Sequence, residues 1–158
     1  MKKKVLLFTI LFTAFTTLGM AQNYSTGAGL RLGSFSGITV KQFVSGTNAL
    51  EGIASFRWGG FAITGLYEWQ KPIRGANNLD YFLGLGGHIG FWGDQYYWHD
   101  EDHPGSYTII GVDFIAGLEY TFPGVPFNVG LDWKPAFNLI GDTHWWGDGL
   151  GFSIRYTF

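Results

Sequence analysis

Residues 149–158 alternate between apolar and polar or small side chains, and this pattern limits the fold more than any other feature of the chain. The apolar positions are Leu150, Phe152, Ile154, Tyr156 and Phe158. A period of two places successive side chains on opposite faces of a β-strand, so the pattern predicts a strand with one apolar and one polar face. Similar alternation recurs towards the N-terminus, and no segment keeps the 3.6-residue period of an amphipathic helix.

Turn-forming residues divide the alternating segments into eight expected strands. Their ranges are 24–33, 38–44, 50–58, 61–70, 79–92, 107–122, 127–139 and 149–158. The connector Pro123–Pro126 is too rich in proline to continue a strand, and the longer connectors 93–106 and 141–148 fall at the opposite end. Long loops at one end and short turns at the other are typical of transmembrane barrels. We therefore expect an all-β fold, an eight-stranded antiparallel transmembrane β-barrel with up-and-down topology.

The N-terminal segment has the three parts of a secretory signal peptide. Residues 2–4 are lysines, and the stretch that follows them is uncharged and mostly apolar. Gly19 and Ala21 place small residues at positions −3 and −1 of a cleavage site. We expect removal of residues 1–21 and a mature barrel of residues 22–158. The competing interpretation, an uncleaved membrane anchor, needs a longer apolar run of about 20 residues.

Composition excludes several classes of protein. The chain has no cysteine, which excludes disulfide scaffolds, thiolate zinc sites and thiol nucleophiles. A net charge of −2 gives no sign of a nucleic-acid-binding surface. Only 14% of the residues are charged, and 19% are aromatic. The chain also contains 25 glycine residues among 158, and this combination is unusual for a small soluble domain. Because residues 22–158 contain no apolar stretch long enough for a membrane helix, a membrane location requires strands.

The polar faces of the expected strands carry charges of both signs. The set comprises Arg31, Lys41, Glu51, Arg57, Glu68, Asp80, Asp113, Glu119, Asp132, Lys134 and Arg155. Its near-neutral total suits a closed interior in which charges pair. The apolar faces hold too many large side chains for the narrow lumen of an eight-stranded barrel, and aromatic residues gather at strand ends. We therefore expect a salt-bridged lumen without a continuous water path; a soluble lipocalin-like barrel, with the faces reversed, is the alternative.

Several motifs resemble those of a known group of proteins. They are Ile110–Asp113, Gly117–Phe122, Leu131–Asn138 and Ser153–Phe158. On these motifs the chain resembles the small outer-membrane β-barrel proteins of Gram-negative bacteria, in the eight-stranded OmpA/OmpX-like superfamily, and above all its barrel-only members. The resemblance implies that the protein is secreted across the inner membrane and then inserted as an integral barrel in the lipid of the outer membrane. It also implies that the terminal strand, with Tyr156 and Phe158, is the signal read by the barrel-assembly machinery.

The sequence offers few residues for chemistry. His99, His103 and His144 lie among acidic and aromatic side chains and are weak candidates for a metal site; we expect solvated loops, no metal and no cofactor. His88 lies on a polar face and is expected to be a hydrogen-bonded lumen residue. Outer-membrane lipid deacylases carry a histidine and a serine two positions apart on one strand, and no histidine of this chain is followed by serine at that spacing.

The sequence therefore favours a non-enzymatic outer-membrane barrel with a structural role, or a role in surface binding or adhesion through its extracellular loops. The expected partners are lipid, the assembly machinery and an unidentified extracellular ligand, with no nucleic acid, and the expected state is a monomer. The alternatives are a small-molecule or ion channel or carrier, the soluble barrel and a lipid-modifying enzyme. Single-channel conductance would favour the channel, and a Ser–His pair at the outer rim would favour the enzyme.

Overall fold

The computed structural model describes residues 24–57, 60–92, 107–141 and 143–158. The side chains of Arg57 and Tyr107 are outside this description, as are the predicted signal peptide and the loop histidines His99 and His103. Within the described residues, no helix is both long and apolar enough to cross a membrane.

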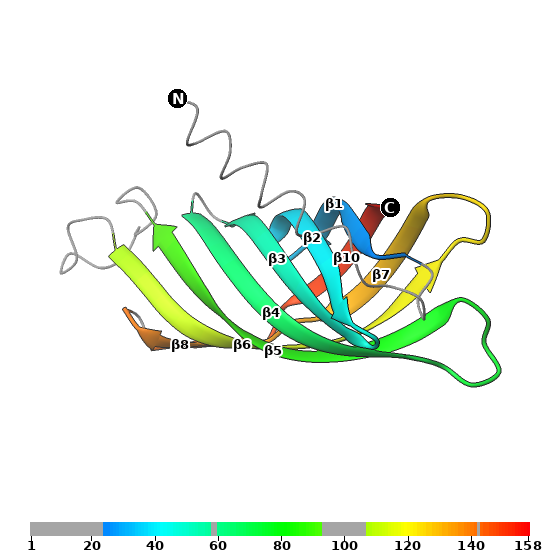
Figure 1. Ribbon diagram of the computed structural model, residues 1–158. Helices are drawn as coiled ribbons and strands as arrows, with labels where there is room; N and C mark the ends of the chain where they lie inside the picture. The colour runs from blue at the N-terminus through cyan, green and yellow to red at the C-terminus, as the bar shows by residue number, and fades with distance from the viewer. Residues whose placement is uncertain (1–23, 58–59, 93–106, 142) are drawn as a thin grey trace, which may run out of the picture.

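The described chain is built from β-strands and their connections (Figure 1). The strands are β1 (Thr26–Gly33), β2 (Ser36–Ser45), β3 (Asn48–Arg57), β4 (Gly60–Pro72), β5 (Leu79–Trp92), β6 (Tyr107–Thr121), β7 (Phe127–Trp133), β8 (Ala136–Ile140), β9 (Trp145–Trp146) and β10 (Leu150–Thr157). Two of the tight turns contain Gly46 and Gly124, whose φ angles of 46° and 78° lie in the left-handed region that glycine adopts without steric cost.

The sheet closes on itself. From β1 to β7, each strand pairs antiparallel with the next one in the chain, and β1 pairs with β10 from Gly27–Thr157 to Gly33–Gly151. The pairing of β5 with β6 completes the ring. Because β7 and β8 together occupy one position in the wall, the fold is a closed eight-stranded antiparallel barrel. The predicted all-β, up-and-down eight-stranded fold is confirmed.

One expected strand, 127–139, is divided into two. The break lies at Pro135, which has no N–H for the ladder. Its carbonyl still accepts a hydrogen bond from the backbone N of Phe114 at 3.0 Å, and both halves remain antiparallel to β6. The inward side chains therefore stay at even-numbered positions on both sides of the break. The connector 141–148, expected as a loop, contains the short strand β9 paired with β8.

The barrel has two different ends (Figure 1). At one end, called here the termini end, lie Tyr24, Phe158 and the β2–β3, β4–β5 and β6–β7 turns. At the other, called the loop end, lie the β1–β2 connection and the described segment that leads into β10. An even number of strands requires this arrangement, because each antiparallel step reverses the chain direction.

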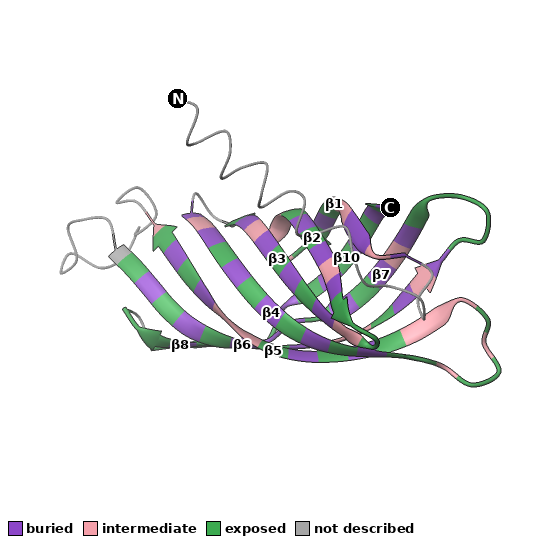
Figure 2. Cartoon of the chain, viewed as in Figure 1, coloured by how far each residue is buried: buried purple, intermediate pink, exposed green. Residues whose placement is uncertain are grey.

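Side chains alternate between the lumen and the outer surface along the strands (Figure 2). On β10, Arg155 is 1% exposed, whereas its neighbours Ile154 and Tyr156 are 42% and 50% exposed. The outer surface is apolar, and the lumen is mainly polar. A smaller apolar group also lies inside, made of Ile53, Leu66, Phe82 and Ile115. A soluble barrel has the reverse arrangement, with its apolar face inside.

Aromatic side chains pair on the outer surface near both ends. At the termini end, the rings of Phe127 and Tyr156 lie 5.5 Å apart in an edge-to-face arrangement. At the loop end, the rings of Phe56 and Phe61 lie 5.1 Å apart. Aromatic girdles at two levels are what a barrel presents to the two interfaces of a membrane.

Candidate functional site

The lumen gathers nine charged side chains that are each at most 3% exposed: Arg31, Lys41, Glu51, Glu68, Asp113, Glu119, Asp132, Lys134 and Arg155. A charge removed from water is costly unless a partner and hydrogen bonds compensate it, so the pairing inside the barrel determines what the lumen does. The charges form three groups: a central cluster around Glu119, a pair made by Arg31 and Asp132, and an outer cluster around Asp113.

Glu119 on β6 is the hub of the central cluster. Its Oε1 accepts hydrogen bonds from the Tyr24 hydroxyl at 2.6 Å and from Gln70 Nε2 at 3.0 Å. Its Oε2 lies 3.4 Å from Lys41 Nζ and 3.2 Å from Arg155 Nη1. Donors from four separate segments of the chain therefore meet on one carboxylate, which ties distant parts of the wall together through the lumen.

Arg155 on β10 joins Glu119 to a second carboxylate. Its Nη2 pairs with Glu51 Oε1 on β3, and the same oxygen accepts a hydrogen bond from the Thr39 hydroxyl. Glu51 and Arg155 are separated by 104 positions in the chain and meet only because the sheet closes. Charge-assisted contacts of this kind are stronger than neutral hydrogen bonds.

Lys41 on β2 makes the equivalent link from the other side. Its Nζ lies 2.7 Å from Glu68 Oε2 and also forms an ion pair with Glu119. The same ammonium lies 4.2 Å from the centre of the Phe82 ring, where the ring face attracts the cation. An aromatic side chain thus serves inside the lumen as part of the charge network.

Tyr24 precedes β1 and closes the lumen at the termini end. Its ring meets Phe43 edge-on at 5.1 Å, and both side chains pack with Ala49. Burial and the negative charge of Glu119 raise the pKa of the Tyr24 phenol well above its usual value, so the hydroxyl stays a donor. At the same end, Gln70 Nε2 also donates to the half-buried Asp80 at 2.9 Å.

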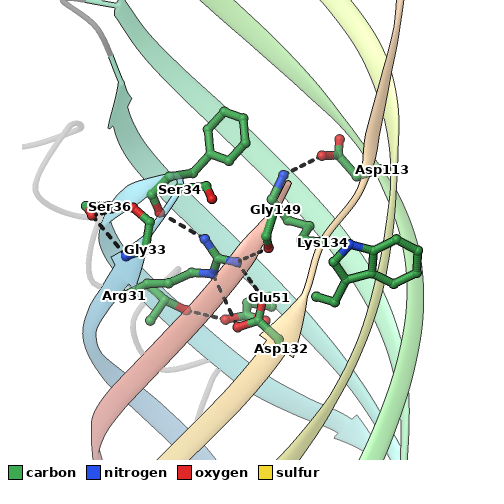
Figure 3. A network of polar contacts seen from close by, with 12 residues as sticks. Arg31, Gly33, Ser34, Ser36, Glu51, Asp113, Asp132, Lys134 and Gly149 are labelled. Atoms are coloured by element: carbon green, nitrogen blue, oxygen red, sulfur yellow. Dashed lines mark hydrogen bonds and ion pairs between the residues drawn. The ribbon is translucent and has the colours of Figure 1, made fainter. Parts of the chain in front are cut away.

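Arg31 and Asp132 form a pair of their own (Figure 3). The guanidinium of Arg31 contacts both carboxylate oxygens of Asp132, and it also donates to the carbonyls of Phe35 at 2.9 Å and Gly149 at 3.2 Å. Both carbonyls belong to connections at the loop end. One side chain therefore anchors the β1–β2 connection and the segment before β10 to the barrel wall.

Asp113 on β6 organises the outer cluster. Its Oδ1 accepts a hydrogen bond from Lys134 Nζ at 2.5 Å, and its Oδ2 lies 2.7 Å from His88 Nδ1. The second ring nitrogen of His88 lies 3.1 Å from Asn138 Oδ1. Both nitrogens of this imidazole thus face a carboxylate or an amide. Neither contacts a hydroxyl of the described residues that it could activate as a nucleophile.

A small chamber lies beside the outer cluster towards the loop end. The space in it that a water-sized molecule can occupy is about 20 Å³. Polar side chains of the outer cluster and of Ser55 and Thr64 line it, together with the rings of Phe35, Trp92 and Trp146. Lys134 Nζ lies 5.0 Å from the Phe35 ring, so the aromatic side chains and the cluster are in direct contact.

The structure separates two residues that the sequence places on neighbouring strands. Asp132 and Arg155 do lie on paired strands, but Asp132 contacts Arg31, whereas Arg155 reaches Glu51 and Glu119. Of the other expected lumen charges, Asp80 is half-buried at the termini end and the side chain of Arg57 lies outside the description. The rest are inside the barrel: Lys41, Glu68, Asp113 and Lys134.

The sequence analysis did not name the two hydroxyl groups of the central cluster, those of Thr39 and Tyr24. Thr39 lies two positions before Lys41 on β2 and therefore on the same face, so the period of two was a sufficient signal for its inward position. Tyr24 carried no such signal: alternation continued back from Arg31 puts it on the outer face, yet it is buried.

The remaining sequence candidates lie outside the lumen. His144 is exposed, and its ring meets Trp146 edge-on at 4.8 Å. Among the described residues, no group of three or more His, Cys, Asp or Glu side chains is placed to hold a metal ion. Tyr156 and Phe158 are 50% and 63% exposed, and the Phe158 carbonyl accepts a hydrogen bond from Thr26 N at 2.9 Å, where the barrel closes.

Comparison with known proteins gives a structural match. No protein-family model matches the sequence, and no curated protein sequence matches it. The fold is similar to the crystal structure of the N-terminal β-barrel domain of Pseudomonas aeruginosa OprF, with a TM-score of 0.64 and 14% sequence identity. The match covers 84% of this chain and 95% of the OprF domain. The chain thus has the fold of that eight-stranded barrel domain.

Proposed function

We propose that this protein is an integral barrel of a bacterial outer membrane with a non-enzymatic role. In this role the barrel is a rigid monomeric scaffold that holds its loop end at the cell surface. The scaffold acts in envelope structure, or in surface binding or adhesion towards an extracellular ligand. The barrel-assembly machinery inserts it after secretion across the inner membrane and removal of residues 1–21.

The observation that carries the proposal is the cross-linked lumen. Glu119, Arg155 and Lys41 join opposite walls of the barrel, and the Arg31–Asp132 pair holds two loop-end segments. Interior side chains that are engaged with one another support a scaffold rather than a transport path. The engagement of both ring nitrogens of His88 supports a role without catalysis.

The outer surface supports the membrane location. Leu30, Leu131 and Ile154 are 54%, 59% and 42% exposed on three different strands. In water, so continuous an apolar surface would drive aggregation, whereas lipid tails accommodate it. The aromatic pairs at the two ends add the interfacial girdles expected of such a barrel.

A pair of epitope insertions tests the location and the orientation. One tag is inserted after Thr143 at the loop end, and the matched control is inserted after Gly124 in the β6–β7 turn. We expect antibody to label the first tag on intact cells and the second only after the outer membrane is permeabilised. Equal labelling on intact cells, or recovery of the tagged protein in the soluble fraction, would contradict the proposal.

A shortened loop separates the two forms of the role. A strain lacking the protein is complemented with a barrel whose segment 142–148 is replaced by a short turn. If the role is envelope structure, the shortened barrel restores resistance to detergent. If the role is surface binding, the shortened barrel is present in the membrane but does not restore attachment.

A further inference from the structure

The described lumen charges outside the central cluster balance one to one. Arg31 pairs with Asp132, and Lys134 pairs with Asp113. His88 also contacts Asp113, and its ring carries a charge only when protonated. These groups therefore need no further counter-charge.

The central cluster has one carboxyl group too many. Among the described side chains, its two basic members are Lys41 and Arg155, and they face Glu51, Glu68 and Glu119. All five side chains are at most 1% exposed, so water cannot compensate an excess negative charge. The cluster requires one additional proton or cation.

Glu119 is not the group that takes the proton. Its two oxygens accept hydrogen bonds from four donors, which belong to Tyr24, Gln70, Lys41 and Arg155. A carboxyl group surrounded entirely by donors is stabilised in its ionised form. The additional proton belongs elsewhere in the cluster.

Glu51 and Glu68 are the two groups with unused oxygens. Glu51 Oε2 and Glu68 Oε1 are buried, and no donor from the described residues bonds to either of them. The two residues are diagonal neighbours on the lumen face of paired strands, because Glu51 on β3 lies opposite Leu66, two positions before Glu68 on β4. At this spacing two long side chains reach each other, so the two carboxyl groups meet. Carboxylate oxygens only accept, so two of them in contact need a proton between them. A divalent cation would need more oxygen ligands than this pair supplies.

We propose that Glu51 and Glu68 form a proton-binding site in the lumen and share one proton at neutral pH. The shared proton gives the pair a donor and brings the cluster to neutrality. The pair contacts Thr39 and Lys41 on β2 and Arg155 on β10, and both cations also reach Glu119 on β6. Asp132 on β7, held by Arg31, lies beside Glu51 (Figure 3). Arg155 contacts Glu51, and Lys41 contacts Glu68. Each of the two acids therefore has one cation, and the two acids share the proton.

Infrared spectroscopy observes the proton directly. The folded full chain is measured at neutral pH in a detergent without ester groups, where the carbonyl stretch of an un-ionised carboxylic acid is free of overlap. We expect one such band, shifted on exchange into D2O. The band is absent from Glu68→Gln and from Glu51→Gln, because the amide supplies the missing donor.

The matched control is Asp80→Asn, which removes a carboxyl group at the termini end and leaves the band in place. A wild-type spectrum without the band overturns the proposal, and this result needs no variant to fold. A band that persists in both glutamine variants overturns it as well. If the band is missing and the barrel instead becomes more stable with added Na⁺ or K⁺, the site binds a metal cation and the proposal is wrong.

Stability provides a second readout. At neutral pH the unfolded chain has released its glutamate protons, and the folded chain keeps this one, so folding takes up one proton. The folding equilibrium constant therefore falls about tenfold for each pH unit above neutrality through this site. Urea unfolding of wild type and Glu68→Gln across this range should differ by that slope. Parallel curves would show that the folded pair holds no proton.

Discussion

Arg31 on β1 and Asp132 on β7 form an ion pair across the intervening strand β10, at the point where β10 has Gly151. A Cβ atom on Gly151 would overlap the guanidinium of Arg31. The side chain of Arg31 can therefore cross β10 only because Gly151, the residue over which it passes, has no side chain. The ion pair connects β1 to β7 across β10, and Arg31 also bonds to Gly149 at the loop end (Figure 3).

Adding one methyl group at this position should weaken the barrel. Gly151→Ala forces Arg31 away from Asp132, and we expect a loss of about 1–3 kcal/mol, as for other overpacked interiors. Urea unfolding in detergent or lipid measures the loss. Gly65→Ala is the matched control, because a Cβ there meets nothing within 4 Å. Equal stabilities of the two variants would show that Arg31 does not need the space over Gly151.

Removing Arg155 should destabilise the barrel rather than abolish a reaction. Arg155→Leu leaves Glu51 and Glu119 buried without their main counter-charge, a change that typically costs about 3–5 kcal/mol. Thermal or urea unfolding measures the effect. Arg74→Leu, in the exposed turn between β4 and β5, should change stability by less than about 0.5 kcal/mol. An unchanged midpoint for Arg155→Leu would mean that its ion pairs contribute nothing.

A charge on the outer surface should be costly if that surface faces lipid. Ile154→Arg or Leu131→Arg near the middle of the membrane is expected to cost about 2–4 kcal/mol in unfolding from bilayers. Val125→Arg, in the β6–β7 turn, is the control and should cost little, because Val125 is 51% exposed outside the strands. Similar losses at all three positions would argue against lipid contact at Ile154 and Leu131.

Deletion of Phe158 should reduce assembly. The proposed signal ends the most regular strand of the chain, and the Phe158 backbone also bonds to Thr26. We expect less heat-modifiable folded protein in the outer membrane and an unchanged amount exported. Phe122→Ala removes an exposed aromatic ring from the same end and should leave the yield unaffected. Equal folded yield after the deletion would remove Phe158 from the signal.

The wild-type barrel should not conduct ions. The central cluster crosses the lumen at Glu119, and Tyr24 with Phe43 closes the termini end. Planar-bilayer recordings are therefore expected to show no reproducible conductance. Steady openings of a single size would establish a pore and promote the channel over the scaffold.

The sequence predicts which way a side chain points more readily than it predicts what the side chain meets. Period-two alternation assigns Arg155 and Ile154 to opposite faces, because pleating alone determines that choice. The partners of Arg155 depend on ring closure: Glu51 lies on a strand that is not a neighbour of β10 in the sheet. Local patterns contain no information about contacts across a lumen.

Two departures from the expected pattern have local causes. Pro135 removes a ladder donor and divides a strand, yet the alternation continues through it because the register with β6 is unchanged. Tyr24 turns inward ahead of β1, where Glu119 offers an acceptor and Phe43 offers a ring.

Phe82 and Ile115 are apolar but face the lumen, so polarity alone would misplace them.

The pairing of β1 with β10 also restricts when the protein can fold. Thr26 and Phe158 bond to each other from opposite ends of the described chain, so the first strand is not fully paired until the segment around residue 158 is available. Vectorial, strand-by-strand folding during synthesis would leave two open sheet edges, each a template for aggregation. The barrel can therefore close only after both β1 and β10 are available, and until then the unpaired edges of these two strands are the places where aggregation would begin.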